Sequence, residues 1–222
     1  GRDITNLKNA DEKINKLLEE KEFLLREVHH RIKNNMNMIV GLLTLQLDSF
    51  ENPEAVSAIQ DAISRVHSMG LLYDKLYRTK SFINTSVKEY LSLLIDEILI
   101  LFPKHKKITL EKEIDDFILD EKKLFPLGII LNELLTNSMK YAFDNTENPK
   151  IEIKVSQKEN RILMIIKDNG KGLPKNLDMK NPTGFGLNLI AIMAKQIGGI
   201  FEIDGINGVT CYLEFEIESK KK

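Results

Sequence analysis

Two adjacent histidines, His29 and His30, stand out in this chain because their type and their setting could support chemistry. They lie in residues 27–46, where apolar side chains recur at steps of three and four, as on one face of an amphipathic helix. The stripe consists of Val28, Ile32, Met36, Ile39 and Leu43. His30 falls between its turns and is expected to point toward solvent or a partner domain. A basic and amide-rich cluster follows: Arg31, Lys33, Asn34 and Asn35.

A solvated helix face that happens to carry histidines is the simpler interpretation of this stretch. For a lone histidine that interpretation would usually be preferred. The dense polar cluster favours a function here, and so does a second group of polar and glycine-rich motifs much further along the chain.

The first of these motifs is the helical stretch L-N-E-L-L-T-N-S-M-K-Y-A-F at residues 131–143. Glu133 and Asn137 are four residues apart and Lys140 follows three later, so on an α-helix they share one face. A carboxylate, an amide oxygen and an ammonium group could together hold a hydrated magnesium ion and phosphates, because Mg²⁺ takes oxygen ligands and keeps several waters. Taken alone, the motif is better explained as a polar helix face.

The second motif is D-N-G-K-G at residues 168–172, at the end of a predicted strand. The ionised carboxylate of Asp168 accepts hydrogen bonds only, so it can select the exocyclic amino group of adenine over the carbonyl of guanine. Gly170 and Gly172 would let the backbone approach a flat ring closely. The alternative is a plain turn, because D-N-G is a common turn sequence.

The third motif is T-G-F-G-L-N-L-I at residues 183–190, a glycine-rich entry to a helix. Free backbone N–H groups and the helix dipole favour phosphate at such a place. The motif does not match the Walker pattern, so a P-loop fold is not expected.

The order of the three motifs is more specific than any one of them. Helix E-x-x-x-N, strand-end D-x-G-x-G and then G-x-G before a helix resembles the ATP-binding (GHKL-type) domain shared by gyrase, Hsp90, MutL and histidine kinases. Together with H-H-R-I-K-N-N upstream, the chain closely resembles a sensor histidine kinase of the second HisKA-type family, related to the HWE kinases. The resemblance covers nearly everything from Leu24 to Ile217.

The resemblance implies catalytic roles. His30 matches the phospho-accepting histidine, because the related kinases carry a single His directly before R-x-x-N. Arg31 stands where the commonest kinases place an acidic residue, which leaves the general base open, with Glu27, one turn earlier, as a candidate. Asn34 could orient water for dephosphorylation. Glu133 matches the acidic residue that activates water in ATPases of this fold.

The resemblance also implies a nucleotide site for ATP and Mg²⁺. Asn137 would hold Mg²⁺, while Lys140 and Tyr141 would line the phosphate and ribose region. Asp168 would bind adenine, supported by Thr210 from a neighbouring strand. Four glycines would make room for the base or shape the lid beside the phosphates: Gly170, Gly172, Gly184 and Gly186.

The elements that must position these residues fall into three segments. Residues 1–22 carry an imperfect heptad pattern and are expected to form a coiled-coil linker from a sensor domain. Residues 23–80 are expected to form an antiparallel helical hairpin for dimerisation and histidine phosphotransfer. One hairpin cannot cover its own apolar surface, so we expect a homodimer with a four-helix bundle. A single amphipathic helix docked on its own domain is the alternative for the first segment.

Residues 81–222 are expected to form the catalytic ATP-binding domain. Strands and helices occur there in separate blocks, which predicts one mixed sheet with helices on a single face. The fold class is therefore α+β, a helical hairpin followed by an α/β sandwich of the Bergerat type.

Composition limits the remaining possibilities. The chain has 222 residues and a formal net charge of -1, so its bulk charge suggests no nucleic-acid partner. Cys211 is the only cysteine, which excludes a disulfide framework within one chain. No apolar run reaches the length of a membrane span, and we expect a cytoplasmic protein. The D-I-T at residues 3–5 resembles the end of PAS sensor domains.

The resemblance thus implies a protein-histidine kinase of a two-component system. It would autophosphorylate with Mg-ATP and pass the phosphoryl group to an aspartate on a response-regulator receiver domain. Two alternatives stay open. An ATPase of the same fold that clamps a dimer would explain Glu133 but leaves the histidine helix without a purpose. A non-catalytic dimeric adaptor would have a degraded nucleotide site, whereas all three motifs are intact.

Overall fold

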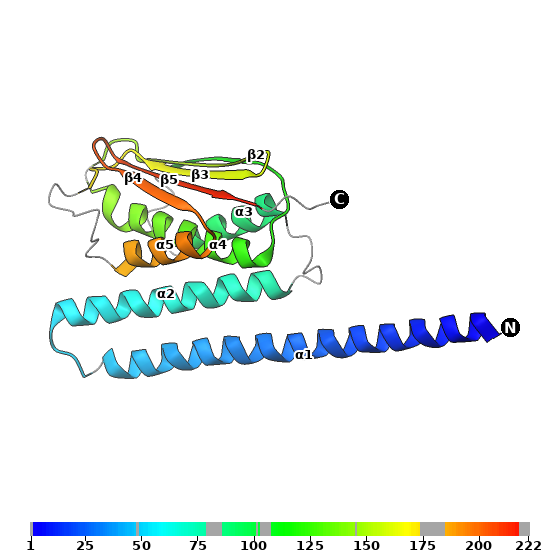
Figure 1. Cartoon of the computed structure of the whole chain (residues 1–222). Coiled ribbons are helices and arrows are strands. Elements are labelled where there is room, and N and C mark those ends of the chain that lie inside the picture. The colour runs from blue at the N-terminus through cyan, green and yellow to red at the C-terminus, as the bar shows by residue number, and fades with distance from the viewer. Residues whose placement is uncertain are drawn as a thin grey trace. The chain divides into compact units, whose positions relative to one another are not determined.

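The chain divides into two compact units, Gly1–Lys80 and Ser81–Lys222, in a computed structural model (Figure 1). The structure describes residues 2–47, 49–78, 86–100, 102, 108–144, 146–173 and 185–217. None of the helices within these ranges is both long enough and apolar enough to cross a membrane.

The first unit is a hairpin of two long helices, α1 (Arg2–Leu47) and α2 (Pro53–Arg78) (Figure 1). The turn between them ends where the Asn52 side chain accepts a hydrogen bond from the Glu54 backbone N–H over 2.9 Å. Pro53 occupies the first helical position, where its missing N–H has no intrahelical partner to lose. These local signals explain why α2 begins at this residue.

The apolar stripe predicted on α1 is divided between two faces in the structure. Ile32, Met36 and Leu43 are half-buried, and the Met36 sulfur lies 3.7 Å from where a Cβ would stand on Gly70 of α2. Val28 and Ile39 are 49 % and 44 % exposed. Some side chains of the stripe are half-buried and others exposed, because the face of α1 that packs on the single helix α2 is narrower than the full apolar stripe. A second apolar face therefore remains exposed on α1 within one chain: Met38, Ile39, Leu42 and Leu45.

The second unit contains one mixed sheet, as predicted, and among the described residues it has five strands. The strands are β1 (Thr109–Ile114), β2 (Lys150–Lys158), β3 (Arg161–Asp168), β4 (Ile200–Asp204) and β5 (Val209–Glu216). Their order in the sheet is β1-β2-β3-β5-β4. β1 pairs with β2 in parallel, and the other three pairs are antiparallel.

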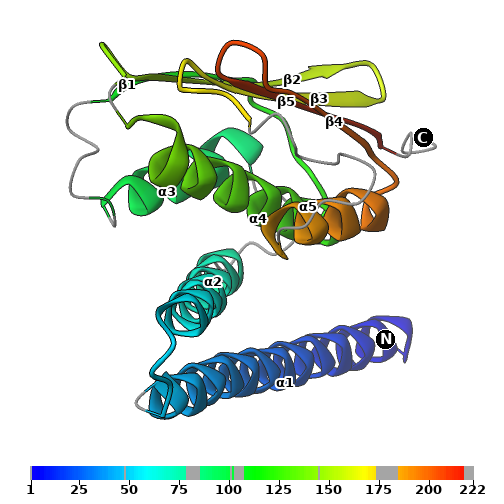
Figure 2. The ribbon, with the colours of Figure 1, turned by 90° about the vertical axis from the view of Figure 1, so that its left-hand side faces the viewer.

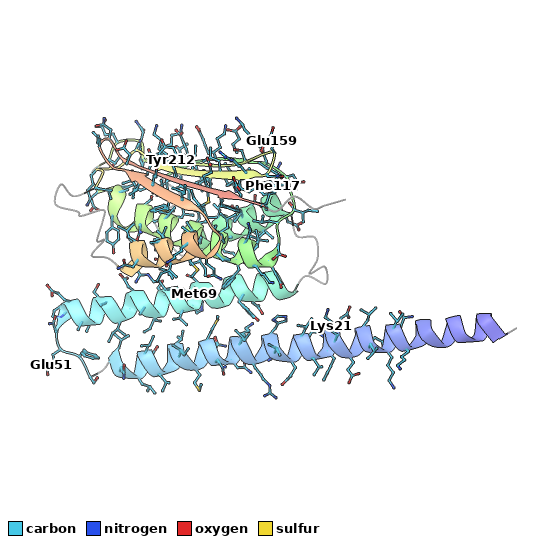
Figure 3. The ribbon with its side chains drawn as sticks, in the orientation of Figure 1. Lys21, Glu51, Met69, Phe117, Glu159 and Tyr212 are labelled. Carbon is cyan, nitrogen blue, oxygen red and sulfur yellow. The ribbon has the colours of Figure 1, made fainter. Side chains whose placement is uncertain are left out.

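The helices α3 (Val87–Ile100), α4 (Glu121–Asn137) and α5 (Phe185–Gln196) cover one face of this sheet (Figures 1 and 2). Alternation along the strands explains the layering. On β2, Ile151, Ile153 and Val155 are buried, while Lys154 between them is exposed. Tyr212 of β5 lies on the opposite, outer face and is 40 % exposed (Figure 3).

α4 is the central helix of this layer, and it does not continue as an α-helix to residue 143. It ends at Asn137 and continues as a π-helical turn, η2 (Ser138–Ala142). The wider turn changes the direction of the side chains that follow, so Lys140 does not keep the α-helical phase with Glu133 and Asn137 that their spacing predicts. Short π-helical turns within α-helices are frequently found at functional sites.

Candidate functional site

The carboxylate of Asp168 is the centre of the candidate site in the second unit. It stands at the last residue of β3 and is 2 % exposed. Its Oδ1 accepts hydrogen bonds from the backbone N–H groups of Gly170, over 2.9 Å, and Val209, over 3.2 Å. Its Oδ2 accepts a hydrogen bond from the Ser138 hydroxyl over 2.8 Å. These donors compensate the burial of a charge and fix the orientation of the carboxylate.

The turn η2 closes against the loop that follows Asp168. The Lys171 backbone N–H donates to the carbonyl of Ala142 over 3.0 Å, and the Lys171 ammonium pairs with Asp144 over 3.1 Å. Gly170 packs against the same carbonyl, since a Cβ built there would lie 2.5 Å from the Ala142 oxygen. The strand end and the helix end therefore form one tightly packed corner.

Packing inside the protein also accounts for Gly172. Its φ is +76°, in the left-handed region that favours glycine, and an added Cβ would collide with the carbonyl oxygen of Gly205. The Leu173 backbone N–H donates to that same carbonyl over 3.1 Å. Whatever the loop binds, Gly170 and Gly172 are already required by the contacts that the loop makes with its own chain.

The residues predicted for phosphate and magnesium lie at and just after the end of α4. Glu133 is 2 % exposed, while Asn137 and Lys140 are half-buried and Tyr141 is 54 % exposed. Gly186 is buried in the first turn of α5. Gly184 lies outside the described residues.

Within the described residues, no group of three or more His, Cys, Asp or Glu side chains is arranged to hold a metal ion. Mg²⁺ does not require such a cage, because it keeps several waters and uses one or two protein oxygens together with substrate phosphates. The amide oxygen of Asn137 has the right chemistry for one protein ligand to a magnesium–nucleotide complex.

The structure does not bring Thr210 to the aspartate. Thr210 pairs with Lys167 in the β3–β5 ladder, and strand alternation puts its side chain on the sheet face opposite to that of Asp168. The support that the resemblance implied for Thr210 is provided by Val209 and Ser138. Sequence reasoning missed Ser138, although it lies in the helical motif at residues 131–143, because nothing in that motif shows which carboxylate 30 residues away it meets.

The two histidines of α1 face different surroundings in the first unit. His30 is exposed. His29 is half-buried, and its Nδ1 lies 2.6 Å from the hydroxyl of Tyr73 on α2, with the two ring centroids 5.4 Å apart. One turn along, Lys33 pairs with Asp74 over 3.0 Å. His29 therefore belongs to the contact between the helices, whereas His30 is directed away from it.

Two further predicted residues flank His30. Glu27 accepts a hydrogen bond from the Arg31 guanidinium over 2.9 Å, an exposed pair one helical turn apart. Asn34, one turn after His30, is exposed. Glu27, His30 and Asn34 have the (i, i+3) and (i, i+4) spacings of neighbours on a helix surface.

Each of the two units contains a segment that matches a family of known proteins. A family described as histidine kinase matches residues 27–102, and one described as histidine kinase-, DNA gyrase B- and HSP90-like ATPase matches residues 123–220. The sensor histidine kinase PdtaS of Mycolicibacterium smegmatis is 28 % identical over 215 residues, which cover 94 % of this chain and 40 % of the relative.

A solved histidine kinase domain from the Erythrobacter litoralis EL346 blue-light activated histidine kinase has a similar fold. The TM-score is 0.62 at 18 % identity, over 88 % of this chain and 91 % of that one. The order of the site motifs, the fold and these matches show that the chain belongs to the histidine kinases. Within them it combines a histidine kinase segment of the second HisKA type with a GHKL-type ATPase domain. It spans 40 % of the length of the PdtaS relative.

Proposed function

We propose that this chain is the catalytic core of a two-component sensor histidine kinase, which transfers the γ-phosphoryl group of Mg-ATP to His30 and then to an aspartate of a response-regulator receiver domain. The observation that carries the proposal is the fixed, buried carboxylate of Asp168, packed beside the end of the helix that carries Asn137. It supports recognition of a purine amino group next to a site for Mg²⁺ and phosphates.

When ATP is bound, Asp168 accepts a hydrogen bond from the adenine amino group. Asn137 provides an oxygen for Mg²⁺, which supplies charge neutralisation at the phosphates when bound. Lys140 adds a positive charge there, and Tyr141 lines the ribose region. Gly186 lies in the first turn of α5, where backbone N–H groups favour phosphate. Gly184, which lies outside the described residues, is proposed to contribute to the same phosphate region. Catalysis of phosphoryl transfer consists largely of such positioning and charge stabilisation.

His30 supplies the nucleophile, because it is exposed on α1 while His29 is held by Tyr73. An imidazole nitrogen forms the N–P bond as the bond between the γ-phosphorus and the bridging oxygen breaks, and ADP leaves. The remaining imidazole proton passes to a base, for which Glu27 is the candidate. Asn34 orients water for the reverse, dephosphorylating reaction.

Glu133 is the acidic residue nearest to Asn137 along the helix, one turn before it, and it is 2 % exposed. In an ATPase that clamps a dimer, the corresponding residue would activate water. In the kinase we assign it a supporting role at the same end of α4.

The proposed assembly is a cytoplasmic homodimer that receives its signal from a sensor domain of the PAS kind. The exposed apolar face of α1 supports the dimer. Ile39 is 44 % exposed, and the other three side chains are between 58 % and 73 % exposed: Met38, Leu42 and Leu45. A second hairpin would cover these side chains in a four-helix bundle. Two exposed leucines nearer the N-terminus, Leu17 and Leu18, support a coiled-coil linker.

Incubation of the full chain with ATP labelled at the γ-phosphate tests the proposal. We expect label on the protein that is lost in acid and kept in base, as for a phosphoramidate. Release of inorganic phosphate without label on the protein would instead identify an ATPase clamp. Neither label nor hydrolysis, with intact dimers, would identify an adaptor.

A further inference from the structure

The hydrogen bonds to Asp168 leave one acceptor site of its carboxylate unused, and they determine which of the two oxygens carries that site. An ionised carboxylate has about four lone-pair sites, two on each oxygen. Among the described residues, Gly170 and Val209 donate to Oδ1, and Ser138 alone donates to Oδ2. The remaining acceptor site is therefore on Oδ2, the oxygen that Ser138 holds.

The Ser138 hydroxyl must be the donor in this contact, since an ionised carboxylate only accepts hydrogen bonds. Ser138 is 8 % exposed and Asp168 is 2 % exposed, so the hydroxyl and the carboxylate meet inside the protein. Without the hydroxyl, Oδ2 would lose the one donor that the described residues provide, while Oδ1 would keep both backbone donors. The orientation of the unused acceptor on Oδ2 thus depends on this hydroxyl.

We propose that Ser138 is a positioning residue for purine recognition. Its hydroxyl aims the free acceptor of Asp168 Oδ2 at the 6-amino group of the nucleotide, and so contributes to the preference for adenine. Ser138 follows Asn137 directly and is the first residue of the π-helical turn. Its hydrogen bond to Asp168 therefore joins the end of α4 that would hold Mg²⁺ to the end of β3 that would bind the adenine base. The inference rests on the proposed function, because it presumes that this site binds ATP.

Calorimetric titration of the full chain with two nucleotides in Mg²⁺ tests the inference. ATP carries the 6-amino group, and purine riboside triphosphate lacks it. We expect Ser138→Ala to weaken ATP binding by about ten-fold and to leave binding of purine riboside triphosphate within about two-fold of the wild type. Ser138→Thr, which retains a hydroxyl, should restore most of the difference between the two nucleotides.

Ser86→Ala is the matched control, because Ser86 also donates to an aspartate, Asp116, over 2.6 Å in the same unit. It should alter stability but not nucleotide preference. Equal loss of both nucleotides in Ser138→Ala would show a merely structural role and overturn the inference, and so would unchanged ATP binding. If the wild type binds no ATP, the proposed function fails first and the inference falls with it.

Discussion

The Nδ1 atom of His29 lies 2.6 Å from the hydroxyl oxygen of Tyr73, and this contact joins the two helices of the hairpin one residue before His30. Adjacent residues on a helix differ by about 100° in direction, so two neighbouring histidines cannot serve one incoming phosphate equally. The contact gives the two histidines separate roles: His29 joins the two helices, and His30 faces outward.

The first prediction separates these roles. His30→Gln should abolish phosphorylation and leave ATP binding intact, because it removes only the nucleophile. His29→Gln and Tyr73→Phe should each weaken the reaction without eliminating it, because they loosen the helix contact beside His30. Acid-labile label on the protein is the measurement. Label kept in His30→Gln and lost in His29→Gln would reverse the assignment.

The second prediction concerns Asp168→Asn. The amide has a donor end that can face the adenine amino group, and hydrogen bonds to charged groups are worth about 1.5–3 kcal/mol. ATP affinity should therefore fall by about ten-fold or more on that scale, with the fold unchanged. Asp96→Asn, at an aspartate of α3 that pairs with Lys112, is the control. Near-normal calorimetric binding by Asp168→Asn would remove the residue from the site.

A third prediction addresses assembly. Apolar residues recur on α2 at steps of three and four, at Val56, Ile59, Ile63 and Val66, and all four are half-buried. A charge placed in this stripe by Ile63→Asp would be buried without a partner in the dimer, at a cost of several kcal/mol. Sedimentation should show monomers or aggregates in place of dimers. Ser64→Asp, at the adjacent exposed position, should leave the dimer intact. A wild-type chain that is monomeric at micromolar concentration would contradict the dimer itself.

The fourth prediction compares two glycines with similar backbone angles. Gly172 and Gly198 have φ values of +76° and +71°, but an added Cβ meets the Gly205 carbonyl oxygen at Gly172 and nothing within 4 Å at Gly198. Gly198→Ala should cost roughly 1–2 kcal/mol of unfolding free energy for the left-handed backbone alone. Gly172→Ala should cost about 1–3 kcal/mol more for overpacking. Equal midpoints in urea unfolding would refute this difference.

The fifth prediction uses the buried thiol of Cys211. Burial, and next the nearby negative charge of Asp168, raise the pKa of this thiol from 9.0 to about 12. The unfolded chain then releases the thiol proton at lower pH than the folded chain, so the thiol favours folding below pH 9 and this contribution is lost as the pH rises toward 12. Unfolding measured across that range should show a steeper fall in stability for the wild type than for Cys211→Ala. Parallel pH profiles would contradict the raised pKa.

Local spacing in the sequence was enough to predict most of the helices and strands and the order of the site motifs, although the helix expected to reach residue 143 ends as an α-helix at Asn137. The stretch I-E-I-K-V-S at residues 151–156 alternates apolar and polar side chains, which predicts a half-buried strand, and β2 forms there with Ile153 buried. The stretch around Glu133 predicted a helix, and α4 includes it. Such patterns are readable because a helix or strand repeats at a fixed period along the chain, whatever lies far away in sequence.

Only the tertiary structure decided what surrounds these residues. Asp168 is held by Ser138, 30 residues before it, and by Val209, 41 residues after it, and no local period encodes which distant donors meet a carboxylate. The π-helical turn that changes the direction of Lys140 follows α4 without any marked break in its helical pattern. The separation of His29 from His30 likewise depends on Tyr73, which the hairpin brings back along α1 from 44 residues away.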